Sequence, residues 1–287
     1  MSLTVGVTGG TGFIGKQLVK ALIKQGFNVI SFQRSKSNNE NVETRYFDLS
    51  KINTINEELL KGVDVLIHTA ALVHNLKANS NSYKSMNYDA TKQLFYFSKK
   101  LRVKKFIFLS TVAVYGMNSH NSTIDINSQT KPNSHYAKSK LNSEIDILTA
   151  KNNKMIVCVI RLPLVLGKNA PGNYGYLDKI SRSKIPLPFG LTNNKRSVIS
   201  LNILVKVLIK ACKYLNAYQG LNLLAERKPI STKQLLINLR SSYSMPPNLL
   251  PIPKFLMKIF LTLIGKREIY EKLYEDLVFK GSIDEFV

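Results

Sequence analysis

The sequence predicts an α/β fold: a doubly wound parallel sheet followed by a smaller, irregular C-terminal domain. Strand-like and helical runs alternate through the first two thirds of the 287-residue chain. Such alternation is typical of a parallel sheet with right-handed crossovers and helices on both faces. After Gly167 the alternation gives way to loops rich in Pro and Gly. We therefore expect a dinucleotide-binding Rossmann domain over residues 1–167 and a substrate domain over residues 168–287.

Short apolar runs bounded by turn signals predict the strands. They cover residues 3–8, 28–32, 44–47, 63–69, 105–110 and 155–161. Helical periodicity is clearest over residues 87–100 and 136–150. Beyond Gly167, a short strand near 197–200 and a helix over 201–215 are expected to return to the Rossmann part.

The chain is strongly basic, with 41 Lys and Arg against 18 Asp and Glu and a formal net charge of +23. This charge fits an anionic substrate, an anionic membrane surface or nucleic acid. The lysines are scattered, without a block of five and without a groove-reading motif, so we expect no nucleic-acid partner. Lysines flank the apolar helical segment 252–264, which predicts either a peripheral membrane contact or a core helix of the small domain.

The cysteine pattern and the N-terminus predict a cytoplasmic protein without a metal site. Cys158 and Cys212 lie in apolar runs and have neither disulfide nor metal-ligand spacing. The first strand begins almost at Met1, with no signal-peptide pattern before it. No apolar run reaches the roughly 20 residues that a membrane span needs.

The glycines after the first strand predict a dinucleotide site. Gly9, Gly12 and Gly15 follow the G-x-x-G-x-x-G spacing between a strand and a helix. The first permits a tight turn, the second lets backbone N–H groups approach a pyrophosphate, and the third lets helix and strand pack closely. Because the flanking strand and helix supply the required context, we expect this turn, with Phe13 and Ile14, to bind the cofactor.

A second pattern carries acid–base chemistry, although its spacing alone also fits a solvated helix face. Tyr136 and Lys140 lie four residues apart at the start of a helix, and therefore on one side of it. A neighbouring ammonium favours phenolate and lowers the pKa of a tyrosine. Thr111 ends a buried strand at the carboxyl edge of the sheet. Around a nicotinamide, we expect Thr111 to bond the substrate oxygen, Tyr136 to move its proton, and Lys140 to hold the ribose.

Together these motifs resemble the extended short-chain dehydrogenase/reductases of the NAD-dependent epimerase/dehydratase family, which act on nucleotide sugars. The matching segments are TGGTGFIG at 8–15, DL at 48–49, HTAA at 68–71, NYDAT at 87–91, STVAVYG at 110–116 and YAKSK at 136–140. The resemblance implies that Asp48 and Leu49 contact the adenine ring. It further implies that Ala70 and Ala71 line the nicotinamide side and that Asn87 braces the active-site helix.

The second half is similar to the substrate domain of bacterial polysaccharide enzymes that work at C4 of UDP-hexosamines. The similarity lies in segments 161–167, 185–190 and 194–197. It implies a UDP-sugar substrate whose uracil and diphosphate end is held by Asn173 and Arg196. A guanidinium suits a diphosphate because its fork donates two charge-assisted hydrogen bonds. Arg161, at a strand end, fits a structural ion pair equally well.

The resemblance also bears on assembly and on length. Family members often dimerise through two helices on one side of the sheet, here near 87–100 and 136–150, so a homodimer is expected by resemblance only. The chain ends at Val287, earlier than such proteins normally end. We therefore expect it to lack a final helix over the small domain.

Two departures from the family pattern narrow the expected reaction. Val112 and Ala113 follow Thr111 where 4,6-dehydratases have an Asp-Glu pair, which argues against dehydration. Arg34 follows the second strand, where NAD-preferring members have an acid, so NADP(H) is favoured over NAD(H). We expect a 4-ketoreductase that makes a UDP-6-deoxy-N-acetylhexosamine. The alternatives are a C4 epimerase of a UDP- or polyprenyl-diphosphate-linked sugar with tightly bound NAD and, remotely, a non-catalytic dinucleotide sensor.

Overall fold

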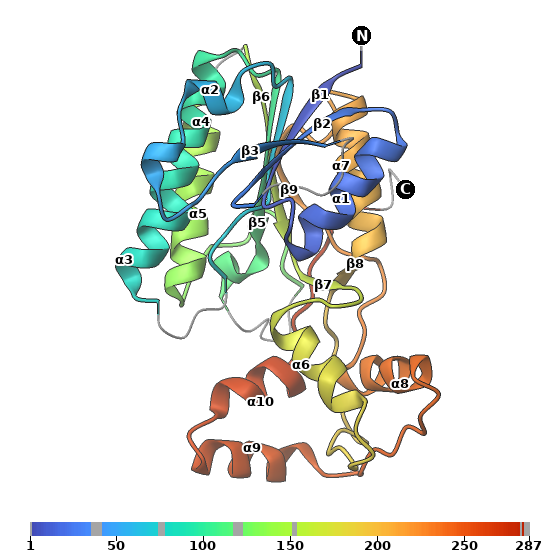
Figure 1. The fold of residues 1–287 in the computed structure, drawn as a ribbon. Helices are drawn as coiled ribbons and strands as arrows, with labels where there is room; N and C mark the ends of the chain where they lie inside the picture. Colours follow the sequence, from blue (N-terminus) through green and yellow to red (C-terminus); the bar gives the residue numbers. More distant parts are fainter. Residues whose placement is uncertain are drawn as a thin grey trace.

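The computed structural model describes residues 2–35, 42–73, 78–116, 123–150, 154–281 and 283. Its centre is a seven-stranded parallel sheet (Figure 1). The strand order is β3 (Glu43–Tyr46), β2 (Asn28–Gln33), β1 (Thr4–Thr8), β4 (Val65–His68), β5 (Lys105–Thr111), β6 (Ile156–Leu162) and β9 (Gly220–Leu223). The order reverses between β1 and β4, and such a switch point is where open α/β sheets bind ligands. The predicted doubly wound sheet is confirmed.

Helices cover both faces of the sheet (Figure 1). One face carries α1 (Phe13–Lys24) and α7 (Leu201–Lys213), and the other carries α2 (Glu57–Leu60), α4 (Ala90–Lys100) and α5 (His135–Thr149). A short helix α3 (Ser80–Tyr83) and a π-helical segment (Lys84–Asp89) lead into α4. Short 3-10 turns occupy Ile52–Thr54 and Val112–Tyr115. Because apolar clusters fill the space on both sides, the central strands are apolar on both faces rather than alternating.

The predicted strands form within one or two residues of their expected ends, but β9 was not predicted. It is only four residues long and contains a half-buried Asn222, so neither length nor alternation marks it as a strand. It pairs with β6. The helix expected from residue 87 starts instead as the π-helical segment, and regular α4 begins at Ala90.

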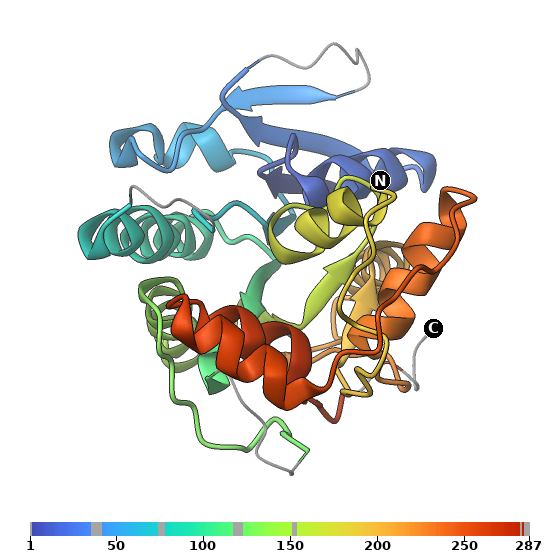
Figure 2. The ribbon, with the colours of Figure 1, turned by 90° about the horizontal axis from the view of Figure 1, so that it is seen from below.

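A second, smaller unit lies beyond the carboxyl ends of the strands (Figures 1 and 2). It comprises α6 (Gly172–Ser181), α8 (Thr232–Ser242), α9 (Lys254–Leu263) and α10 (Arg267–Tyr274), joined to the sheet through the strand pair β7 (Leu164–Leu166) and β8 (Val198–Ser200). Its own apolar cluster includes Leu177, Phe189, Leu236, Leu261 and Tyr274. Within the residues that the structure describes, no helix has the length and apolar character to cross a membrane, and no group of acids, His and Cys suited to a metal ion occurs.

Candidate active site

The glycine turn between β1 and α1 is a backbone cradle that only glycine permits. Gly9 has a φ of +69°, and its carbonyl accepts a hydrogen bond of 2.9 Å from the N–H of Gly12. A Cβ atom at Gly15 would lie 2.2 Å from the Gly9 oxygen. This approach lets the first turn of α1 sit directly against the end of β1.

The start of α1 leaves backbone donors for a ligand. Its N-cap is Gly12, which offers no side-chain acceptor, whereas serines cap α5, α7 and α8. The first N–H groups of α1, including those of Phe13 and Ile14, therefore lack a capping partner among the described residues. Such uncapped donors at a glycine-lined helix start fit the pyrophosphate of a dinucleotide.

Gly15→Ala is expected to weaken dinucleotide binding by at least about tenfold, because the new methyl group would push the turn away from the Gly9 carbonyl. Gly190→Ala is a matched control, since a Cβ there would lie 2.8 Å from the oxygen of Leu250, within the smaller unit. Calorimetric titration of both variants with NAD measures the effect. Equal losses in the two variants would show general destabilisation instead of a damaged cradle.

The loop after β4 lies against this turn. A Cβ at Gly9 would lie 3.1 Å from the Ala70 nitrogen. The Thr8 hydroxyl accepts hydrogen bonds from the N–H groups of Thr69 (3.1 Å) and Ala70 (3.2 Å). Ala70 and the following Ala71 are half-buried, and their contact with a nicotinamide stays a prediction.

His68, at the end of β4, holds this loop in a buried chain of hydrogen bonds. The Thr8 hydroxyl, already accepting twice, donates to His68 Nδ1 (2.7 Å). His68 Nε2 then donates to the Thr91 hydroxyl (2.9 Å), which donates to the Asn87 carbonyl (2.5 Å). Burial, assisted by the nearby Lys140 charge, holds the pKa of His68 well below its usual value. His68 therefore stays neutral and links Thr8 to Thr91. Its hydrogen-bond partners fix one tautomer of the ring.

Asn87 connects the same loop to α5, as expected of a brace. Its side-chain oxygen accepts from the Leu72 N–H (2.7 Å), and its amide donates to the Leu72 carbonyl (2.9 Å) and the Ser139 hydroxyl (3.3 Å). The backbone oxygen of Asn87 accepts from Ser143, also on α5 (3.1 Å). π-Helical turns often occur at functional positions, and here the turn presents both the side chain and the carbonyl of one residue.

The three predicted catalytic residues lie on two elements that pack together. Thr111 ends β5, and its hydroxyl accepts from the Ala113 N–H at 3.1 Å. Tyr136 lies in the first turn of α5, which Ser134 caps through the Ala137 N–H (3.1 Å). One turn later, Lys140 is 3% exposed, with its Nζ 4.1 Å from the centre of the Phe108 ring on β5. The chemistry-bearing face of α5 is thus turned toward β5.

Burial shifts the pKa values of both α5 residues. It raises the pKa of Tyr136 above its usual value, and the nearby Tyr83 adds to this. It lowers the pKa of Lys140 to about 7, although Glu144 acts in the opposite direction. The sequence predicts a lowered pKa for Tyr136, because the neighbouring Lys140 ammonium favours the phenolate. That direction is wrong here, since the burial of both groups has the larger effect on the pKa of Tyr136. At neutral pH the Tyr136 phenol therefore retains its proton in this structure.

The lowered pKa of Lys140 predicts a pH-dependent stability. The unfolded chain keeps the ordinary pKa of 10.5, so above about pH 7 it binds more protons than the folded chain does. The free energy of unfolding should therefore rise with pH from about 7 to about 10 through this group. In Lys140→Met this contribution should be absent. Thermal unfolding of both proteins across this range tests it, and a melting-temperature difference that stays constant with pH would contradict it.

The predicted adenosine end has a cation and an anion at neighbouring strand ends. Asp48 follows β3, and its carboxylate accepts from the N–H (3.0 Å) and hydroxyl (2.8 Å) of Ser50. Although burial opposes the shift, these bonds and the charge of Arg34 lower the pKa of Asp48. Leu49 packs on the apolar cluster beneath. The structure thus brings Arg34 and Asp48 into one electrostatic environment.

The two predicted substrate residues lie in different surroundings. Asn173 is exposed in the first turn of α6. The Arg196 guanidinium donates to the carbonyls of Glu271 (3.3 Å) and Glu275 (3.0 Å) at the end of α10, and burial lowers its pKa to about 10. Arg196 therefore holds α10, a role the sequence could not indicate because those carbonyls lie far along the chain. Contact with a diphosphate stays a prediction for both residues.

Arg161 forms a structural ion pair, which is one of the roles that the sequence predicts for it. Its Nη2 and Nε donate to Glu144 Oε2 at 2.6 and 3.0 Å, and its Nη1 donates to the Tyr115 hydroxyl at 2.6 Å. Ser110 also donates to Glu144. Sequence reasoning missed Glu144, although an acid one turn after Lys140 on the same face of α5 was a usable signal. The cluster joins α5, which carries Tyr136 and Lys140, to β5 and β6.

Comparison with known proteins identifies the family of this chain. Residues 5–187 match the model of the NAD dependent epimerase/dehydratase family. The chain belongs to this family. A UDP-glucose 4-epimerase from Vibrio cholerae is 30% identical over 286 residues, covering 95% of this chain and 86% of that protein.

The name of a second relative of this epimerase/dehydratase chain describes an enzyme that acts on a lipid-linked sugar. It is the N-acetyl-alpha-D-glucosaminyl-diphospho-ditrans,octacis-undecaprenol 4-epimerase of Escherichia coli O157:H7, 27% identical over 88% of this chain and 77% of that protein. Among solved structures, a Bacillus cereus UDP-glucuronic acid 4-epimerase in complex with NAD superimposes with a TM-score of 0.73. It shares 21% identity, with 88% of this chain and 86% of that chain covered. That likeness supports the fold.

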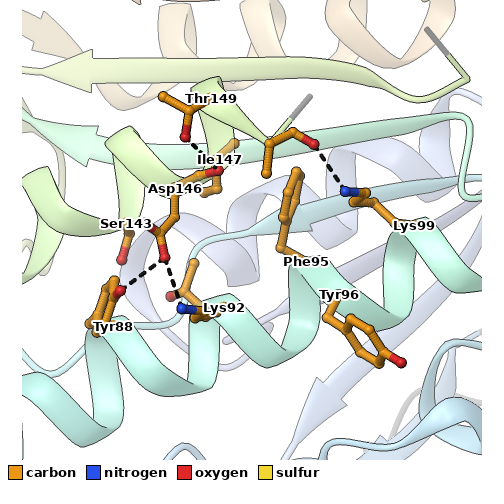
Figure 3. Close-up of a pocket in the computed structure, with 11 residues that line it drawn as sticks. Tyr88, Lys92, Phe95, Tyr96, Lys99, Ser143, Asp146, Ile147 and Thr149 are labelled. Atoms are coloured by element: carbon orange, nitrogen blue, oxygen red, sulfur yellow. Dashed lines mark hydrogen bonds and ion pairs between the residues drawn. The ribbon is translucent and has the colours of Figure 1, made fainter. Parts of the chain in front are cut away.

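The epimerase/dehydratase chain also has a surface groove between α4 and α5 (Figure 3), and none of the three predicted catalytic residues lines it. Its cavity volume is about 340 Å³, and Phe95 and Ile147 form its apolar floor. At its rim, Asp146 accepts from the Tyr88 hydroxyl (2.9 Å) and pairs with Lys92 (3.5 Å). These are the helices through which the homodimer is expected, and that dimer stays a prediction.

Proposed function

We propose that the protein is a 4-epimerase that retains NAD and inverts C4 of a hexose carried on a diphosphate, most simply a UDP-linked hexose or N-acetylhexosamine. The observation that carries the proposal is the 30% identity to a UDP-glucose 4-epimerase over 286 residues, through the sheet and the smaller unit alike. The absence of an acid directly after Thr111, where Val112 and Ala113 are apolar, supports C4 chemistry without dehydration.

In this proposal each residue has a defined task. The glycine turn and the Ala70–Ala71 loop would hold NAD, which would supply the hydride acceptor and donor for inversion at C4. Once its phenol has ionised, Tyr136 would remove the proton of the C4 hydroxyl and later give it back, while Thr111 would hydrogen-bond the same oxygen. Lys140 holds the nicotinamide ribose and, when protonated, stabilises the Tyr136 phenolate.

Identification of the retained dinucleotide is the experiment that tests the reaction type. The purified protein is denatured and the released cofactor is identified by mass spectrometry. We expect NAD at close to one per chain. UDP-glucose and UDP-N-acetylglucosamine labelled with deuterium at C4 are then supplied without added cofactor. Products that are inverted at C4 and keep the deuterium support an epimerase, because the hydride returns to the carbon it left.

The 4-ketoreductase is the second candidate, and Arg34 is the observation that favours it. A ketoreductase exchanges its cofactor at each turnover, so the protein would be purified without dinucleotide and would need added NADPH. Against this, the Asp48 carboxylate offsets the Arg34 charge that a 2′-phosphate would require. The proposal therefore favours NAD.

Arg34→Ser separates the two cofactors. If Arg34 does not bind a 2′-phosphate, the variant should change the affinities for NADH and NADPH by similar and small factors. If it does, NADPH affinity should fall by about tenfold or more while NADH affinity is kept. Fluorescence titration with both reduced cofactors measures this. A selective loss of NADPH would overturn the choice of NAD.

A further inference from the structure

Helix α9 exposes an apolar face that no other part of the described structure covers. Of its residues only Leu261 is buried, and α9 packs mainly on α10. Phe255 is 61% exposed and Leu263 is 81% exposed. The exposed apolar residues of α9 and its C-cap are Phe255, Leu256, Ile259, Phe260, Leu263 and Ile264. At 100° per residue these positions span one continuous half of the helix surface.

The chain that leads into and through α9 is basic, and the acids that follow on α10, Glu268 and Glu271, pair with Lys272 and Arg267. From residue 227 to residue 267 the sequence has eight Lys and Arg and no Asp or Glu. Lys254, Lys258, Lys266 and Arg267 are all exposed next to α9. The face is thus apolar in its middle and positively charged at its edges.

We propose that α9 lies in the interface of an anionic lipid membrane, with its apolar half among the acyl chains and its basic residues on lipid phosphates. A helix with one wide apolar face and flanking lysines binds such interfaces through buried apolar area and electrostatic attraction together. Large exposed apolar patches on soluble proteins mark interaction sites. A partner with negative charge satisfies both features of this surface.

A second copy of the chain fits this face less well. In a two-fold symmetric dimer the same patch would meet itself. The basic edges around Lys254, Lys258 and Lys266 would then approach their own copies, and the acids of α10, Glu268 and Glu271, already pair with Lys272 and Arg267. Like charges brought together in this way oppose association. Anionic headgroups remove this conflict.

Membrane binding through α9 would set the orientation of the whole molecule. In Figure 1, α9 lies at the end of the smaller unit farthest from the sheet. That unit adjoins the carboxyl edge of the sheet, where Thr111 and the glycine turn lie. The candidate site would therefore lie between the membrane surface and the body of the sheet.

Vesicle flotation tests the proposal with the full chain. We expect the protein to float with vesicles of equal parts phosphatidylglycerol and phosphatidylcholine, to bind pure phosphatidylcholine weakly, and to be released by salt. Phe260→Ser with Leu263→Ser should lower binding to the anionic vesicles by about tenfold or more. Tyr214→Ser is the matched control, because Tyr214 is 55% exposed on the Rossmann part.

The basic edge is tested separately. Lys254→Gln with Lys258→Gln should weaken binding to anionic vesicles, whereas Lys20→Gln with Lys24→Gln, an equal charge change on exposed α1 lysines, should not. NAD content and melting temperature should be unchanged in all four variants, since these side chains are exposed.

Two results would overturn the proposal. One is wild-type protein that stays unbound with anionic vesicles at low salt. The other is a wild-type dimer that Phe260→Ser with Leu263→Ser converts to monomers without any change in vesicle binding, which would assign the face to a second copy. The assay uses no sugar substrate, so its outcome is independent of the proposed epimerisation.

Discussion

Tyr136→Phe is expected to lower turnover by about 10²–10⁴-fold while leaving dinucleotide binding intact. The substitution removes only the hydroxyl that carries the proton and keeps the aromatic body at the start of α5. Thr111 and Lys140 would remain, but neither can take the proton of a C4 hydroxyl in its place: a threonine hydroxyl is a poor base and Lys140 is turned toward Phe108. Steady-state rates with UDP-glucose, together with NAD content by mass spectrometry, measure both effects.

Tyr83→Phe provides the matched control for this result. Tyr83 lies close enough to Tyr136 to raise its pKa, and its own hydroxyl donates only a long hydrogen bond of 3.3 Å to the Val73 carbonyl. Turnover in this variant should stay within a few-fold of wild type, with the pH profile moved slightly toward lower pH because Tyr136 loses a neighbour that raises its pKa. A Tyr136→Phe enzyme with nearly full activity would require another proton carrier.

Breaking the buried Arg161–Glu144 ion pair should lower the stability of the fold more than any other substitution proposed for this protein. Arg161→Met is expected to lower the free energy of unfolding by about 3–5 kcal/mol, because it leaves the Glu144 carboxylate buried without its cation. Both side chains are almost fully withdrawn from water, at 6% and 1% exposed. Urea unfolding monitored by circular dichroism measures the loss.

A double variant separates the ion pair from simple packing. Arg161→Met with Glu144→Leu should recover much of the lost stability, because no unpaired charge remains. Lys100→Gln is the control for an ion pair in water: Lys100 pairs with Glu57 at 2.5 Å on the surface, and its loss should change stability little. A single Arg161→Met variant as stable as Lys100→Gln would contradict the assigned role of the buried pair.

Local patterns made much of the fold and site predictable. The glycine turn, the end of β5 and the Tyr136–Lys140 spacing each lie within one short segment, so their residue types and intervals carry the information. The doubly wound sheet follows from the alternation of such segments. These are the features on which sequence and structure agree.

Contacts between distant segments were not predictable from the sequence. Arg196 holds the end of α10, and β9 joins the sheet as a short, weakly patterned strand. The direction of the Tyr136 pKa shift also depended on burial, which only the packed structure supplies. In each case the deciding neighbour lies too far along the chain for a spacing rule to detect.

The hydrogen-bonded chain from Thr8 through His68 and Thr91 to Asn87 separates two tasks within the molecule. All its members come from the sheet side, and none from the smaller unit that follows Gly167. The alignment of the nicotinamide-side loop with α5 is therefore fixed without help from the loops that would grip a sugar. A substitution in the smaller unit that altered its contacts with a sugar should therefore leave this hydrogen-bonded chain, and the seating of α5 that depends on it, in place.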